Sequence, residues 1–173
     1  MESHGCDVEN LDFDAISSHD RVMEIGRHRP AHHPSVERHN KPVIVLVTVC
    51  TKHRRPLLAN RAMFEGLWQI WTDKSIAWRA GRFVLMPDHL HVFCSPGDFQ
   101  GRPVKDWVGY WKRLASAAAG ESLWQDSFWD RQLRNHEHYG QRWQYVLNNP
   151  VRAKLVKTSE EWPWQGEINV LHW

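Results

Sequence analysis

A predicted hairpin at 77–95 constrains the fold more than any other part of the sequence. Two runs rich in apolar and aromatic residues flank a Pro-Asp dipeptide at 87–88, which is typical of tight turns. In the second run, His89 and His91 are two residues apart, and side chains at this spacing point to the same face of a strand. The sequence therefore predicts an antiparallel hairpin that presents two imidazoles on one face of a sheet.

Further strand and helix patterns lie on both sides of this hairpin. The β-branched apolar run at 42–50 predicts a buried strand, and Asn60 is well placed to cap a helix after it. Beyond the hairpin, a helix is expected to begin at Pro103 and to end at Gly120. The mixed alternation of SLWQDSFWDRQL, at 122–133, fits an edge strand.

A last helix completes the pattern. Asn135 can cap it, and it is expected to run to Asn149, because Pro150 cannot continue a helix. The resulting order is β-α-β-β-α-β followed by a C-terminal helix. This order predicts an α+β fold with a ferredoxin-like or RRM-like antiparallel sheet and helices packed on one face. The Trp-rich tail, 151–173, is expected to pack back on the body.

Charge is unevenly distributed along the chain. Residues 1–40 carry four arginines and eight acidic residues, a formal charge of −4, whereas residues 41–173 carry 18 basic and 12 acidic residues, or +6. The first segment contains several His and Pro residues and no sustained helix or strand period, so we expect a mobile N-terminal extension. Residues 41–173 are expected to form one folded domain, whose positive charge favours a polyanionic partner.

Three features favour a cytoplasmic location without membrane association. The sequence starts with an acidic segment that lacks the apolar run of a signal peptide. The longest apolar stretch, 43–49, is too short to span a bilayer. Cys6, Cys50 and Cys94 are odd in number and form no CxxC pair, which indicates free thiols in a reducing compartment rather than a disulfide framework.

The paired histidines are compatible with a metal site or with hydrogen bonding on a wet sheet face. Two imidazoles on one strand can share a metal ion, but a third ligand must come from another segment. A histidine-triad nucleotide hydrolase would have a third alternating histidine at Phe93, and a two-histidine phosphoesterase would have a pair of HxT/S motifs, which the sequence does not have. The chemistry that remains is a divalent metal and a separate nucleophile.

Tyr145 is a candidate for that nucleophile. It lies in the expected last helix, four residues before Asn149, so a phenol and an oxygen ligand would share one helix face. A phenol is a poor nucleophile at its usual pKa of about 10, and a metal ion that polarises a phosphate relieves part of this handicap. From the residues alone, a core aromatic on an amphipathic helix is the simpler interpretation of Tyr145.

Three ordered motifs resemble those of single-tyrosine HUH transposases, above all the REP-associated tyrosine transposases. They are VLMPDHLHVF at 84–93, LWQDSFWDRQLRN at 123–135 and YVLNNPVRAKLV at 145–156, followed by Trp-Pro-Trp at 162–164. The resemblance covers about residues 41–164 and implies an HUH endonuclease fold. Two positions depart from the family pattern. They are Asp88, where Asn or another polar residue is common, and Lys154, where Gly is common.

The resemblance implies specific roles for four residues. His89, His91 and Asn149 would bind Mg²⁺ or Mn²⁺. Tyr145 would attack a scissile phosphate of single-stranded DNA and form a 5′-phosphotyrosine intermediate. The implied partner is a palindromic repeat folded as a hairpin, and the implied activity is cleavage and rejoining of hairpin-flanked DNA at a bacterial nucleoid. We expect a monomer, as in the repeat-associated branch, with the homodimer of the insertion-sequence relatives as the alternative.

Two other functions stay open at this point. A catalytically dormant repeat-binding protein would bind a hairpin without cleaving it. A metal-dependent phosphodiesterase that uses water would need Tyr145 only as a structural residue.

Several basic residues are candidates for phosphate contacts, with a solvated surface charge as the alternative for each of them. They are Lys112, Arg113, Arg131, Arg134, Arg142, Arg152 and Lys154. Trp124 and Trp129 could stack on unpaired bases or belong to the core.

Overall fold

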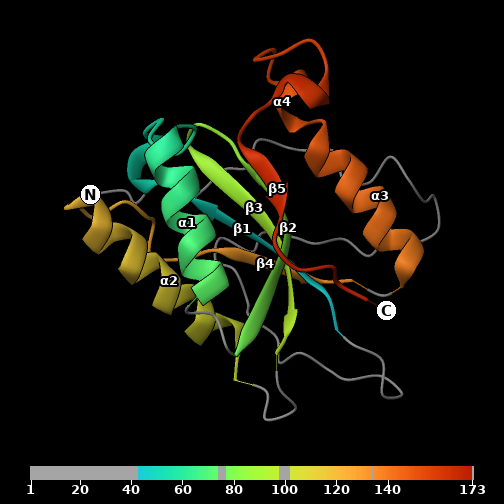
Figure 1. Ribbon diagram of the computed structural model, residues 1–173, viewed down its shortest axis with the longest axis horizontal. Coiled ribbons are helices and arrows are strands. Elements are labelled where there is room, and N and C mark those ends of the chain that lie inside the picture. The colour runs from blue at the N-terminus through green and yellow to red at the C-terminus, as the bar shows by residue number, and fades with distance from the viewer. Residues whose placement is uncertain (1–42, 74–76, 98–101, 134, 173) are drawn as a thin grey trace, which may run out of the picture.

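The computed structural model describes residues 43–73, 77–97, 102–133 and 135–172. The expected N-terminal extension, 1–40, and the candidate DNA contact Arg134 lie outside these residues. The described chain forms a five-stranded antiparallel sheet in the order β4-β1-β3-β2-β5, with helices on both faces (Figure 1). This architecture confirms the predicted α+β class with an antiparallel sheet.

The helices and strands follow the predicted order, with two further short elements near the end. They are β1 (Val45–Cys50), α1 (Arg61–Asp73), β2 (Trp78–Leu85), β3 (His89–Pro96), α2 (Val104–Ala119), β4 (Trp129–Gln132), α3 (His136–Leu147), α4 (Asn149–Arg152) and β5 (Gln165–Glu167). Single 3₁₀ turns, η1 (Lys52–Arg54) and η2 (Ser159–Glu161), follow β1 and precede β5.

The sheet separates two apolar layers. One face carries residues such as Val47 and packs against α1 and α2 (Figure 1), and Trp71 of α1 is buried in this layer. The opposite face includes Phe93 and packs against α3 and the C-terminal tail. The two helices of the β-α-β-β-α-β unit therefore lie on one face, as predicted, and the last helix covers the other. Because His89 and His91 alternate in step with Phe93, both histidines point toward the α3 side.

Three predicted helix ends are confirmed. The side-chain oxygen of Asn60 accepts a hydrogen bond from the Met63 N–H at 3.0 Å, and that of Asn135 accepts one from the His138 N–H at 2.8 Å. Both bonds satisfy an N–H group of the first helical turn, which has no partner within the helix. Gly120 ends α2 with a φ of 70°, a conformation that glycine adopts without steric cost.

The last helix differs from the prediction at its C-terminal end. It stops at Leu147, and Asn149 begins the separate turn α4 instead of ending α3. Pro150 has no N–H to donate to a helical carbonyl and restricts the residue before it, so the interruption falls upstream of the proline. The proline then occupies the first turn of α4, where no N–H is needed. Tyr145 and Asn149 therefore lie on consecutive elements and not on one continuous helix.

The tail packs back on the sheet, as predicted, and adds an edge strand that the sequence did not indicate. β5 pairs with β2, and the Trp162 indole N–H donates to the Leu85 carbonyl at 2.9 Å. Leu171 lies over Gly81, where an added Cβ would come within 2.6 Å of the leucine side chain. With only three residues, β5 is too short to show a strand pattern in the sequence.

The cysteines agree with the prediction only in part. Cys94 is a free, buried thiol on β3, and burial raises its pKa well above the ordinary value. Cys50, at the end of β1, is disulfide-bonded, which differs from the expected free thiols. Across the described residues, no helix is both long and apolar enough to cross a membrane.

Candidate functional site

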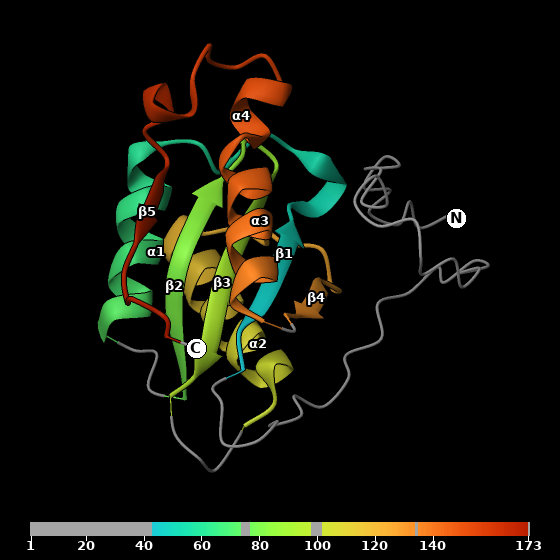
Figure 2. The same ribbon diagram turned by 90° about the vertical axis from the view of Figure 1, so that its right-hand side faces the viewer.

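His89 and His91 lie at the beginning of β3, on the face that α3 covers. Figure 2 shows this end of β3 close to α4 and to the C-terminal end of α3. The two rings are nearly perpendicular, with their centroids 5.0 Å apart. His91 is 4% exposed, and its Nε2 is buried without a hydrogen-bond partner among the described residues. A buried ring nitrogen of this kind is an open position for a ligand.

Each ring is held through its Nδ1 atom. His91 Nδ1 lies 2.8 Å from the hydroxyl of Thr48, which is the residue opposite it on β1. His89 Nδ1 lies 2.7 Å from a carboxylate oxygen of Asp88. Because both Nδ1 atoms are engaged, the Nε2 atoms are the nitrogens left for a ligand.

Arg54 supports Asp88 from the turn that follows β1. Its Nε lies 2.9 Å from the second carboxylate oxygen of Asp88. Neither Thr48 nor Arg54 was predicted from the sequence as part of the site. The signal for Arg54 was the basic segment TKHRRP, which directly follows a buried strand. In the antiparallel register β1 ends opposite His89, so the residues after β1 meet the turn that carries Asp88.

The electrostatic environment keeps the buried ring neutral. Burial lowers the pKa of His91 well below its ordinary value, and nearby positive charges, that of His89 first, add to this effect. For Asp88, burial raises the pKa, but the hydrogen bond and charge of His89 and the charge of Arg54 outweigh burial, and the net shift is downward. The site therefore combines an ionised carboxylate with a neutral imidazole, the form of histidine that binds metals.

Arg152 connects the tyrosine and the asparagine on the helical side of the site. Its guanidinium carbon lies 3.7 Å from the centroid of the Tyr145 ring. One of its nitrogens donates to the Tyr145 carbonyl at 2.8 Å, and the other donates to Asn149 Oδ1. Asn149 is 7% exposed, and Tyr145 is partly buried. The charge of Arg152 also lowers the pKa of His91, so the guanidinium lies within electrostatic reach of that ring.

The elements that carry the four predicted site residues lie close together at one end of the sheet (Figure 2). His89 and His91 come from β3, Tyr145 comes from α3, and Asn149 comes from α4. Three separate elements thus contribute two imidazoles, a phenol and an amide oxygen to one region. Imidazole nitrogens and an amide oxygen are groups that can bind a cation, and a phenol is a group that can act as a nucleophile.

The donor set fits a divalent cation. Among the described residues, no cluster of three or more His, Cys, Asp or Glu side chains could hold a metal ion, so a further protein ligand to the histidine pair must be of another type. The Asn149 side-chain oxygen is of a type that would suit Mg²⁺ or Mn²⁺, and in this structure it accepts a hydrogen bond from Arg152. The buried Nε2 of His91, which has no described partner, supports the same use of the site.

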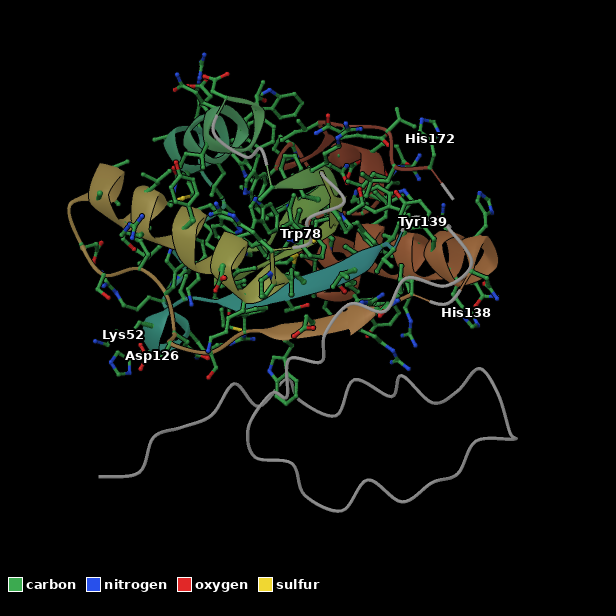
Figure 3. All side chains as sticks on the ribbon, turned by 90° about the horizontal axis from the view of Figure 1, so that it is seen from below. Lys52, Trp78, Asp126, His138, Tyr139 and His172 are labelled. Atoms are coloured by element: carbon green, nitrogen blue, oxygen red, sulfur yellow. The ribbon has the colours of Figure 1, made fainter. Side chains whose placement is uncertain are left out.

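The two other tyrosines lie in surroundings that differ from those of Tyr145. Tyr139 lies on the sheet side of α3, where it is 7% exposed and packs edge-on against Phe93, with ring centroids 5.1 Å apart. The preceding residue, His138, is exposed (Figure 3). Burial raises the pKa of Tyr139. Tyr110 lies on α2, which covers the opposite face of the sheet, and the Arg113 guanidinium is 5.7 Å from its ring centroid.

The candidate DNA contacts have diverse surroundings. The Lys112 ammonium donates to the carbonyls of Gln125 and Asp126, and these hydrogen bonds anchor α2 to the segment before β4. Burial lowers the pKa of Lys112 to about 8. The Arg152 guanidinium contacts Tyr145 and Asn149. The others are spread over four places in the fold. They are Arg113 on α2, Arg131 on β4, Arg142 on α3 and Lys154 after α4.

Trp124 belongs to the core and not to an exposed stacking surface. It is 5% exposed, contacts Trp111 edge-on at 5.4 Å between ring centroids, and donates its indole N–H to the Lys112 carbonyl at 3.2 Å. Trp129 is half-buried on the edge strand β4. Of the two tryptophans, only Trp129 keeps a ring surface that could reach a base.

Comparison with known proteins supports the resemblance that the motifs indicate. No protein-family model matches the chain. A curated relative, the REP-associated tyrosine transposase of Escherichia coli (strain K12), is 30% identical over 86 residues, which cover 47% of this chain. The chain spans half the length of that relative, because the matched segment is 50% of it.

A solved structure has the same fold over most of both chains. It is a REP-associated tyrosine transposase bound to a REP hairpin, and it matches with a TM-score of 0.63 and 19% sequence identity over 82% of each chain. The predicted resemblance to REP-associated tyrosine transposases and the predicted fold class are therefore confirmed.

Proposed function

We propose that the protein is a metal-dependent transposase or endonuclease that cleaves and rejoins hairpin-flanked single-stranded DNA through a tyrosine nucleophile. The observation that supports this proposal most strongly is a buried imidazole nitrogen without a described partner, at the end of the sheet that lies close to α4 and the C-terminal end of α3. The curated relative is named a tyrosine transposase, and the solved relative is bound to a hairpin.

His89, His91 and Asn149 would hold Mg²⁺ or Mn²⁺ in this proposal. When bound, the cation supplies positive charge that polarises the scissile phosphate. The Tyr145 hydroxyl attacks the phosphorus, and the bond from phosphorus to the 3′ oxygen breaks. The phenol loses its proton, the departing oxygen gains one, and the products are a 5′-phosphotyrosine and a free 3′-OH. Reversal by the same or another 3′-OH rejoins the DNA without a further energy source.

The substrate in this proposal is a palindromic repeat folded as a hairpin. The excess of basic residues in 41–173 favours a polyanionic partner, and Arg152 places a permanent positive charge beside the nucleophile. The exposed side chains of Arg113, Arg131 and Lys154 are available for phosphate contacts. We further propose that the protein acts as a monomer in the bacterial cytoplasm.

A catalytically dormant hairpin-binding protein is the second candidate function. It is favoured by one observation, since Asn149 Oδ1 already accepts a hydrogen bond from Arg152 and would have to be shared with, or released to, a metal ion. Such a protein would bind the same hairpin and leave it intact.

A covalent-adduct assay separates these functions. The protein is mixed with labelled single-stranded hairpins, including repeats that flank its own gene, and Mn²⁺, and products are resolved on a denaturing gel. We expect a slow-migrating DNA–protein adduct that EDTA and Tyr145→Phe abolish. Tyr139→Phe is the matched control, because the Tyr139 hydroxyl is buried without a described partner and its loss should leave the adduct intact.

Two outcomes would contradict the proposal. Hairpin binding in a native gel without an adduct would favour the dormant binder. Metal-dependent cleavage that persists in Tyr145→Phe would favour a phosphodiesterase that uses water, with Tyr145 as a structural residue.

A further inference from the structure

We propose that Asp88 and Thr48 are positioning residues that hold His89 and His91 in the tautomer with the proton on Nδ1, so that both Nε2 lone pairs face the proposed metal position. Arg54 completes the arrangement by fixing the orientation of the Asp88 carboxylate. This inference rests on the proposed metal-dependent function and assigns roles to three residues outside the ligand set.

The His89 tautomer follows from the chemistry of its partner. One Asp88 oxygen lies 2.7 Å from His89 Nδ1, and the other lies 2.9 Å from the Arg54 guanidinium. A carboxylate paired with a guanidinium is ionised and accepts hydrogen bonds without donating any. The proton of the Asp88–His89 hydrogen bond therefore belongs to Nδ1, and Nε2 of a neutral His89 ring carries the lone pair.

The His91 tautomer follows from burial. Its Nδ1 lies 2.8 Å from the Thr48 hydroxyl, which can donate or accept, so this contact alone does not place the proton. The Nε2 atom is buried and has no partner in the described structure. A proton on Nε2 would create a buried donor without an acceptor, which is unfavourable. A proton on Nδ1 avoids this penalty by donating to Thr48, and it leaves an Nε2 lone pair for a cation.

The turn after β1 holds Arg54 in a strained backbone conformation. His53 and Arg54 have φ values of 57° and 54°, in the left-handed region that residues with a side chain seldom adopt. The turn is tied to the Asp88 segment by the Thr51 N–H, which donates to the Asp88 carbonyl at 2.9 Å. This geometry directs the Arg54 side chain to the carboxylate, so the strain has a consequence at the histidine pair.

Nuclear magnetic resonance can test the tautomers without metal or DNA. Long-range ¹H–¹⁵N correlation spectra of the imidazoles, recorded where both rings are neutral, should show a protonated Nδ1 and an unprotonated Nε2 for His89 and His91. Asp88→Asn should mix the His89 tautomers and leave His91 unchanged, whereas Thr48→Val should mix those of His91 and leave His89 unchanged. Each variant is the control for the other. A proton on Nε2 of either wild-type ring would overturn the inference for that ring.

Metal binding is the second measurement. Mn²⁺ titrations followed by electron paramagnetic resonance should show affinities about tenfold or more weaker for Asp88→Asn and for Thr48→Val, the effect typical of lost outer partners of metal ligands. Glu65→Gln, which removes an exposed carboxylate paired with Arg61 on α1, is the control and should bind like the wild type.

The positioning roles and the proposed metal-dependent function predict different results. A wild type that binds Mn²⁺, with unchanged affinity in both variants, would refute the positioning roles and leave the proposed function standing. A wild type with the expected tautomers that binds no Mn²⁺, alone or with hairpin DNA, would refute the proposed metal-dependent function instead.

Discussion

The two halves of the candidate site are organised differently. In the strand half, formed by His89 and His91, the contacts from Asp88 and Thr48 lie on the Nδ1 side and leave Nε2 for a ligand. In the helix half, formed by Tyr145 and Asn149, Arg152 contacts the phenol ring and the amide oxygen that would themselves react or bind. In the proposed function, the strand half would bind a metal ion without losing a contact, whereas the helix half would first have to share or release its contacts with Arg152.

Apart from loss of Tyr145, substitution of a proposed metal ligand should reduce adduct formation more than any other change. The loss should be larger for a ligand of the strand half than for one of the helix half. We expect His91→Gln to reduce adduct formation far beyond the roughly 10–100-fold that loss of an outer partner costs. Asn149→Ala should cost less, about tenfold, because water can supply an oxygen ligand to Mg²⁺ or Mn²⁺ in its place. Adduct yields across a range of Mn²⁺ concentrations measure both effects. Equal losses in the two variants would break the distinction between the halves.

Acid should weaken the strand half in the metal-free protein. The pKa of His91 is lower in the folded protein than the 6.5 of an ordinary histidine, so below about pH 6.5 the unfolded chain takes up this proton first. The contribution of His91 to folding stability is therefore full above that pH and falls as the pH drops below it, by at most about 1.4 kcal/mol per pH unit. Urea unfolding at pH 7.5 and pH 5.5 measures this loss. The pH dependence should be shallower in His91→Gln, and an identical dependence would show that His91 titrates normally.

Removal of the Arg152 guanidinium should raise the affinity for metal and slow the formation of the adduct. Arg152→Gln takes a positive charge away from the metal position and releases the Asn149 oxygen, so Mn²⁺ affinity without DNA should rise, by about tenfold for 1.4 kcal/mol of relieved repulsion and competition. The adduct should form more slowly, because Tyr145 loses the group that packs on its ring. Parallel losses of affinity, adduct and melting temperature would indicate that Arg152 has only a structural role.

The smallest expected effect lies just after the helix half. Lys154 has a φ of 58° and an exposed side chain, at the position where the resembled family often has glycine. Lys154→Gly should relieve the left-handed strain and stabilise the fold by up to about 1 kcal/mol in urea unfolding. Lys157→Gly, at an exposed residue without a positive φ, is the matched control and should be neutral or destabilising. A loss of stability in Lys154→Gly would contradict this explanation.

Local patterns predicted most of the secondary structure. The Pro-Asp turn, the caps Asn60 and Asn135 and the stop at Gly120 depend on neighbouring residues, and all four appear as expected. The end of α3 depends on where the chain leaves the helix before Pro150, and the pairing of β5 with β2 depends on tertiary packing. Neither of these has a signature in a short window of sequence.

The sequence predicted the main residues of the candidate site but not the residues that hold them in place. Strand alternation placed His89 and His91 on one face, and the resemblance singled out Tyr145 and Asn149. The roles of Thr48 and Arg54 could not be predicted, because they depend on the register between β1 and β3 and on the path of the turn after β1. Lys112 was a plausible DNA contact by charge alone, but its ammonium is directed at two backbone carbonyls.

By itself, the sequence determined the order of the main helices and strands, and which residue types the hairpin and the last helix carry. These properties follow from periodicity, caps and turns, whose physical causes act over a few residues. The tertiary structure decided that α3 covers the face of the histidines, that Arg152 occupies the helix half, and that Asp88 and Thr48 hold the two rings. Such contacts join residues far apart in the chain, and they exist only when packing on both faces of the sheet brings those residues together.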